Sequence, residues 1–103
     1  MARIAVEFET RPEGKIARVT LENAAKANCL TSALVAEVET TFRDLANDDV
    51  LRLAVLTGEG DRSFIAGANL QELRHFDEAA ARTYITGLTR ANKAIRDLPV
   101  PVL

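Results

Sequence analysis

The chain has 103 residues, of which 48% are hydrophobic and 27% charged, and its formal net charge is -2 at pH 7. These values are typical of one small globular domain with an apolar core, and they exclude a disordered or fibrous chain. Nucleic-acid binding needs clustered excess Lys and Arg, so we expect no nucleic-acid partner.

The longest apolar stretches are far shorter than the ~20 residues of a membrane-spanning helix. The first residues lead directly into a strand pattern without a signal peptide. We therefore expect a cytoplasmic protein with no membrane partner. The single cysteine, Cys29, has no second thiol with which to form a disulfide or a metal cluster, which fits a reducing compartment.

Two alternating segments near the amino terminus predict a pair of strands joined by turn-forming residues at 11–14. The apolar residues on one face of each predicted strand are Ile4, Val6 and Phe8, followed by Ala17, Val19 and Leu21. The stretch 22–28 loses this alternation and is expected to form a loop.

A helix is predicted to begin after Thr31, because apolar residues then recur at helical spacing until polar residues interrupt them at 47–49. Its core-facing residues are expected to be Leu34, Val38, Phe42 and Leu45. The apolar run 51–56 then predicts a strand buried on both faces. Together these segments form a βαβ unit.

Two more helices are predicted in the second half of the chain. Asn69 is expected to cap a short helix, and Asp77 to cap a longer one that Pro99 terminates. The apolar stripe of the longer helix is expected to contain Ala81, Tyr84, Ile85, Leu88, Ala91 and Ile95. Residues 100–103 read as the opening of a buried strand, so we expect the chain to be cut within a structural element.

The segment 64–70 leaves a strand, turns through small residues and enters a helix. Ala66, Gly67 and Ala68 would let a ligand approach the main chain closely, and free amides at the start of a helix favour negative charge. These residues also have a purely structural interpretation, in which Gly67 makes the turn and the alanines pack. The segment alone is consistent with both.

The wider pattern resembles the enoyl-CoA hydratase/isomerase family, the crotonases. Residues 63–73 resemble the family signature F-x-A-G-A-D-L-x-E-L/M, and they follow a strand that ends in Thr57 and Gly58. An Asn-rich loop with Lys26 and Asn28 precedes the first helix, as in that family. The resemblance implies an α/β fold, a crotonase-like spiral of ββα units. Residues 1–103 would be the amino-terminal part of one such domain, incomplete at the C-terminal end.

The resemblance also implies a site. The backbone N–H of Ala68 would donate to the thioester oxygen of an acyl-CoA substrate and stabilise an enolate. Lys26 would lie beside the coenzyme A phosphates or ribose, unless it is simply a solvated loop lysine. Backbone at Ala66, next to Gly67, would meet the adenine. The second oxyanion donor and the catalytic carboxylates are expected beyond Leu103.

The simplest reaction that the resemblance implies is hydration of 2-enoyl-CoA. Enoyl-CoA isomerases, acyl-CoA hydrolases and decarboxylases of the family share this amino-terminal part, and a non-catalytic CoA-binding or assembly module is a further alternative. No metal and no separate cofactor are expected, because the coenzyme A thioester is itself the substrate. The expected assembly is a homotrimer or a dimer of trimers. The 103 residues alone are expected to be incomplete for catalysis.

Two residues depart from the family pattern. Asn69 stands where the family usually has Asp, and Cys29 stands where alanine is common. Both Asn and Asp cap helices, and Cys29 is expected to be a small buried residue. His75 is expected to have a surface or packing role. Solvated carboxylates without a catalytic role are expected at Glu59, Glu72 and Glu78.

Overall fold

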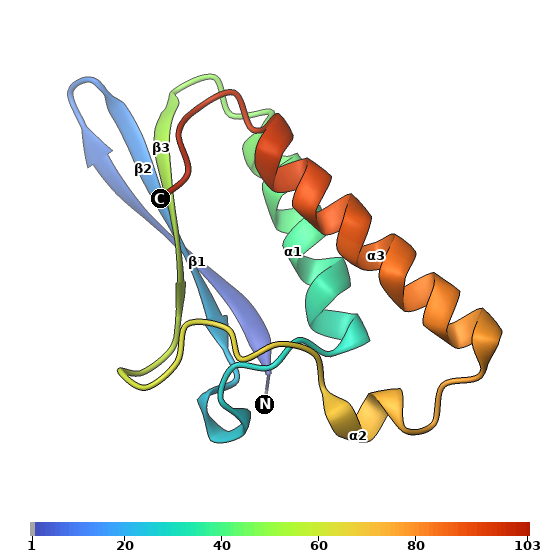
Figure 1. Ribbon diagram of the computed structural model, residues 1–103. Coiled ribbons are helices and arrows are strands. Elements are labelled where there is room, and N and C mark those ends of the chain that lie inside the picture. The colour runs from blue at the N-terminus through green and yellow to red at the C-terminus, as the bar shows by residue number, and fades with distance from the viewer. Residues whose placement is uncertain (1) are drawn as a thin grey trace.

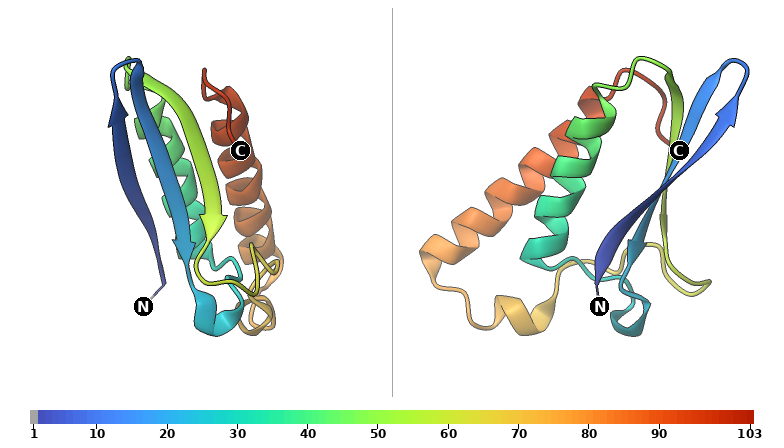
Figure 2. Two further views of the ribbon diagram at one scale, coloured as in Figure 1. Left: turned by 90° about the vertical axis from the view of Figure 1, so that its left-hand side faces the viewer. Right: turned by 180° about the vertical axis from the view of Figure 1, so that it is seen from behind.

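The computed structural model describes residues 2–103, so Met1 of the predicted domain lies outside the described residues. A three-stranded sheet forms one layer, and two helices, α1 and α3, lie side by side on one face of it (Figures 1 and 2). The elements in chain order are β1 (Arg3–Arg11), β2 (Gly14–Glu22), η1 (Ala24–Lys26), α1 (Ser32–Leu45), β3 (Leu51–Gly58), α2 (Leu70–Leu73) and α3 (Glu78–Asp97). No helix within residues 2–103 is long and apolar enough to cross a membrane.

The predicted strand pair is confirmed as an antiparallel hairpin, and β2 then pairs in parallel with β3 across the α1 connection. Ala17, Val19 and Leu21 share one face of β2, as predicted, and all three are fully buried. Their cross-strand partners in β1 are less buried, because β1 is the edge strand and extends past the helices. Ile4, Val6 and Phe8 do lie on one face of β1, as predicted, but Val6 is 37% exposed and Phe8 is 50% exposed.

The predicted helix α1 is confirmed, including its cap. The side chain of Thr31 accepts a hydrogen bond from the Leu34 amide at 3.1 Å, which satisfies one of the free donors of the first turn. The apolar stripe packs against the sheet, and its buried members are Leu34, Val35, Val38, Phe42 and Leu45. Periodicity alone was therefore sufficient to orient this helix.

The prediction that β3 is buried on both faces is only partly correct. Leu51 and Ala54 are buried, whereas Arg52 is exposed and Leu53 is half-buried. Within residues 2–103 the helices cover only one side of the sheet, which leaves the opposite face of β3 open (Figure 1).

The long helix α3 begins at its predicted cap, where the Asp77 carboxylate accepts a hydrogen bond from the Ala80 amide at 2.8 Å. The predicted stripe is too wide, because Ala81 is exposed and Ile85 is 60% exposed. The buried residues of α3 are Tyr84, Ala91 and Ala94. α3 packs closely on α1 at Gly87, where an added Cβ would lie 3.4 Å from Val35 Cγ1.

The prediction that residues 100–103 open a buried strand is only partly correct: they form an extended segment with one isolated parallel bridge to β3, and Leu103 is 74% exposed. The Ala54 amide donates to Pro101 O at 3.0 Å, and the Leu103 amide donates to Ala54 O at 2.9 Å. Val102 lies opposite Ala54 in an isolated parallel bridge. The segment therefore continues the sheet on the side of β3 opposite β2.

Candidate functional site

The loop after β2 and the loop after β3 meet at one end of the sheet (Figure 1). They are joined by a parallel bridge between Leu30 and Ala68. The Leu30 amide donates to Gly67 O at 2.7 Å, and the Asn69 amide donates to Leu30 O at 3.1 Å. Leu30 therefore bonds to the residues on both sides of Ala68.

The Ala68 amide is left free by this arrangement. A residue that lies between the two bonds of a parallel bridge directs its own N–H away from the bridging partner. Within residues 2–103 the Ala68 N–H donates to no backbone carbonyl. It is therefore available to an acceptor outside the chain, as an oxyanion donor must be.

The turn before Ala68 requires glycine for its backbone conformation. Gly67 has φ +103°, which L side chains rarely adopt, although a Cβ built there would have no neighbour within 4 Å. After the turn, the Asn69 side chain accepts a hydrogen bond from the Glu72 amide at 2.9 Å. The prediction that Asn69 caps α2 is thus confirmed, and the fold of this segment does not need the aspartate of the family signature.

A depression of about 340 Å³ opens beside Ala68. It is lined by Lys26, Cys29, Ala66, Ala68, Asn69, Leu70 and Gln71. Three of the four predicted site residues therefore share one concave surface, although Lys26 is about forty positions away from the other two along the chain. The fourth, Gly67, lies in the same turn but does not line the depression.

Asn28 holds the two loops together, a structural role that no local sequence pattern predicted. Its side chain is 1% exposed, accepts from the Asn23 amide at 2.9 Å, and donates to the carbonyls of Glu59 and Ser63 at 2.9 Å each. Gly58 permits the close contact, because a Cβ there would lie only 2.0 Å from Phe64 O. The loop that carries Lys26 is thereby fixed to the loop that carries Ala68.

The three glutamates that we expected to be solvated differ from one another. Glu72 Oε1 accepts from the Ser32 amide at 2.9 Å and from the Ser32 hydroxyl at 2.6 Å, at the amino terminus of α1. Glu59 Oε1 accepts from the Ala24 amide at 3.1 Å. Glu72 is half-buried, so the expectation of a solvated carboxylate is wrong for it, whereas Glu59 is exposed, as expected, and also bonds to the loop after β2. Glu78 is exposed, as expected, and its Oε1 lies 3.4 Å from Arg82 Nη2 in an ion pair on the surface of α3.

Cys29 and His75 occupy different environments. Cys29 is half-buried, and its sulfur lies 3.7 Å from Asn23 Nδ2. Cys29 lines the depression at Ala68. The prediction that it is a buried residue is therefore only partly correct. His75 is exposed just after α2, which agrees with the predicted surface role.

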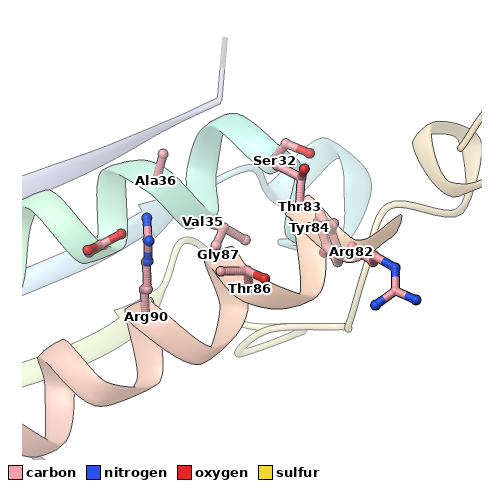
Figure 3. Close-up of a pocket in the computed structure, with 10 residues that line it drawn as sticks. Ser32, Val35, Ala36, Arg82, Thr83, Tyr84, Thr86, Gly87 and Arg90 are labelled. Carbon is pink, nitrogen blue, oxygen red and sulfur yellow. The ribbon is translucent and has the colours of Figure 1, made fainter. Parts of the chain in front are cut away.

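A second depression, of about 410 Å³, lies between α1 and α3 (Figure 3). Its walls include Ser32 and Glu39 of α1 and Arg82, Tyr84 and Arg90 of α3. None of the predicted site residues lines it. It is therefore a separate groove on the helical layer.

The fold is that of a crotonase-type protein. A family model described as enoyl-CoA hydratase/isomerase matches residues 11–103. The chain belongs to the enoyl-CoA hydratase/isomerase family.

Individual relatives agree with this assignment. The short-chain-enoyl-CoA hydratase of Clostridium acetobutylicum is 32% identical over 72 residues, which cover 70% of this chain and 28% of that protein. The crystal structure of an enoyl-CoA hydratase from Bacillus anthracis superposes with a TM-score of 0.87 at 27% identity, covering 96% of this chain and 37% of that one. The crystal structure of an enoyl-CoA hydratase from Mycobacterium smegmatis superposes with a TM-score of 0.83 at 28% identity, covering 94% of this chain and 37% of that one. The chain thus spans about a third of the length of these relatives.

Proposed function

We propose that this chain supplies one of the two N–H donors of an oxyanion hole in an acyl-CoA enzyme, and that the donor is the amide of Ala68. The observation that carries the proposal is the free Ala68 N–H beside a concave surface. The bridge to Leu30 fixes this amide before any ligand binds, and pre-oriented donors are the ones that stabilise developing charge most effectively.

The proposed reaction is the hydration of 2-enoyl-CoA. Addition of water to the double bond places negative charge on the thioester oxygen of an enolate, which an amide donor stabilises. The names of the Clostridium relative and of the two solved structures favour hydration over isomerisation, hydrolysis or decarboxylation. The second donor and the carboxylates that move the proton are proposed to lie beyond Leu103.

The coenzyme A part of the substrate is proposed to lie along the same depression. Lys26 is exposed on η1 and lines the depression together with Ala66 and Ala68. An ammonium group there is suited to a charge-assisted hydrogen bond with a phosphate or to a contact with the ribose. Main chain at Ala66 and Gly67 would meet the adenine. No metal and no additional cofactor are part of this proposal.

The proposed assembly is a homotrimer or a dimer of trimers in the cytoplasm. Family membership supports it, and so do large apolar side chains that are exposed in the single chain, such as Leu70 at 73% and Ile85 at 60%. Such side chains are often covered by protein partners.

The test is to replace Ala68 by proline in the complete enzyme, which includes the proposed residues beyond Leu103, and to measure hydration of crotonyl-CoA. Proline has no N–H, so Ala68→Pro is expected to lower kcat by about 10² to 10³. Ala68→Gly keeps the amide and is the matched control, with activity expected within a few-fold of the parent. A folded Ala68→Pro variant with parental activity would rule out the proposed donor.

A further inference from the structure

The carbonyl of Leu30 receives hydrogen bonds from two distant parts of the chain. One donor is the Asn69 amide at 3.1 Å, directly after Ala68. The other is the hydroxyl of Tyr84, which donates to Leu30 O at 2.9 Å from a position 54 residues away. The peptide group that forms the bridge to Ala68 is therefore also bonded to α3.

Tyr84 is held firmly in place. It is 5% exposed, and its ring packs on that of Phe76 with centroids 5.6 Å apart and planes inclined at 53°. Figure 3 shows Tyr84 in α3 beside the first turn of α1. By contrast, Ala66, Gly67 and Leu70 are exposed. The hydroxyl thus connects an exposed turn to a buried helix face.

Both acceptor positions of the Leu30 carbonyl are in use, since a carbonyl oxygen has two lone pairs. Rotation of this peptide group would break the bond from Asn69, the bond from Tyr84, or both. The orientation of the Leu30 peptide in turn fixes residues 67–69 through the bridge. The direction of the Ala68 N–H therefore depends on a hydroxyl that does not contact the depression.

We propose that Tyr84 is a positioning residue of the oxyanion-binding turn, and that its hydroxyl aligns the Ala68 amide by fixing the carbonyl of Leu30. The inference rests on the proposed role of that amide. Tyr84 does not line the depression at Ala68, so its loss should affect the chemical step and leave substrate binding intact. Displacement of a catalytic group by about 1 Å can reduce the rate by up to about 10².

The experiment compares Tyr84→Phe with Thr83→Val in the complete enzyme, which includes the proposed residues beyond Leu103. Tyr84→Phe keeps the ring that packs on Phe76 and removes only the hydroxyl. Thr83→Val removes a neighbouring hydroxyl that donates within its own helix, to Ala79 O at 3.0 Å. We expect Tyr84→Phe to lower kcat for crotonyl-CoA hydration by about tenfold with KM within about twofold, because one hydrogen bond is lost. Thr83→Val is expected to have the kcat and the KM of the parent.

Amide hydrogen exchange, measured by NMR, provides a second readout that does not depend on activity. The amides to follow are those of Leu30 and Asn69, because they close the bridge to Ala68. Tyr84→Phe is expected to accelerate their exchange about tenfold while exchange in the middle of α1 stays at the parental rate. A parental kcat together with parental exchange at both amides would overturn the positioning role.

The two readouts separate this inference from the proposed function. If the parent protein does not hydrate crotonyl-CoA and Ala68→Pro changes nothing, the proposed function fails, and amide exchange alone then decides whether Tyr84 fixes the turn. If the parent is active and Ala68→Pro abolishes the activity while Tyr84→Phe behaves like Thr83→Val, the oxyanion donor stands and the role of Tyr84 is wrong.

Discussion

The packed core and the paired loops of this molecule are stabilised in different ways. The core lies between the sheet and the two long helices, and its side chains are almost all apolar. The loops after β2 and β3 are joined by the Leu30–Ala68 bridge and by the side chain of Asn28, and the hydroxyl of Tyr84 connects the first of these loops to α3. Apolar packing is non-directional, whereas each of these hydrogen bonds requires one particular atom in one place.

The difference explains where the molecule can position a reactive group. A core tolerates many combinations of apolar residues of suitable volume. The turn at Ala68 has no such redundancy, because its direction depends on Gly67, on the Leu30 bridge and on the donors to Leu30. Substitutions in the core should therefore change stability, and substitutions in the paired loops should change activity in addition.

The largest effect on stability is expected in the core. Phe42 is 0% exposed, and Phe42→Ala should lower the free energy of unfolding by about 4 kcal/mol through lost burial and a residual cavity. Phe8→Ala is the matched control on the half-exposed edge strand, with an expected loss of about 1 kcal/mol. Urea unfolding of the purified protein measures both. A loss at Phe8 equal to that at Phe42 would contradict the position of the core.

A smaller loss of stability with a larger loss of activity is expected for Asn28→Ala. The substitution leaves the Asn23 amide and the carbonyls of Glu59 and Ser63 without their partner, which should cost about 2 to 3 kcal/mol. It also places alanine at φ +56°, which disfavours the folded loop further.

The control for Asn28→Ala is Asn47→Ala, an exposed asparagine just after α1 whose side chain makes one long hydrogen bond of 3.4 Å to Arg43 O. Urea unfolding and crotonyl-CoA hydration are measured on both variants. Per unit of stability lost, Asn28→Ala should reduce kcat more than Phe42→Ala does. The reverse order would remove the distinction between core and loops.

The same distinction accounts for what the sequence could predict. Strand and helix positions follow from local periods of two and 3.6 residues, so α1, the hairpin and the caps Thr31, Asn69 and Asp77 were predicted correctly. The predicted apolar stripe of α3 was wrong at Ile85, which is exposed, because a periodic pattern does not reveal how far a neighbouring layer extends.

The polar contacts of the site could not be predicted in this way. Tyr84 was placed correctly in an apolar stripe, but its hydrogen bond joins residues 54 positions apart, and the bond from Asn28 to Ser63 spans 35. No local pattern specifies such partners. The positions of Ala68 and Lys26 came from the family resemblance, which carries tertiary information that periodicity lacks. Their roles, and the assignment of residues 1–103 to a single domain, stay predictions.

The smallest expected effect concerns the ionisation of Tyr84, and it tests how tightly the loops are closed. Burial raises the pKa of the Tyr84 hydroxyl, and the negative charges of Glu72 and of an ionised Cys29 raise it further. The unfolded chain loses this proton near pH 10. Because the folded-state pKa is higher, stability should be unaffected below about pH 10 and should fall as the pH rises through the folded-state pKa.

Tyr84 is the only tyrosine of the chain, and there is no tryptophan, so its phenolate absorbance can be followed directly. The absorbance of the folded protein should rise at a higher pH than that of the urea-unfolded protein. Tyr84→Phe should remove both the signal and the contribution of this hydroxyl to the dependence of stability on pH. A folded-state titration that coincides with the unfolded one would mean that the hydroxyl is open to solvent, and the hydrogen bond that joins α3 to Leu30 would then not restrain the turn at Ala68.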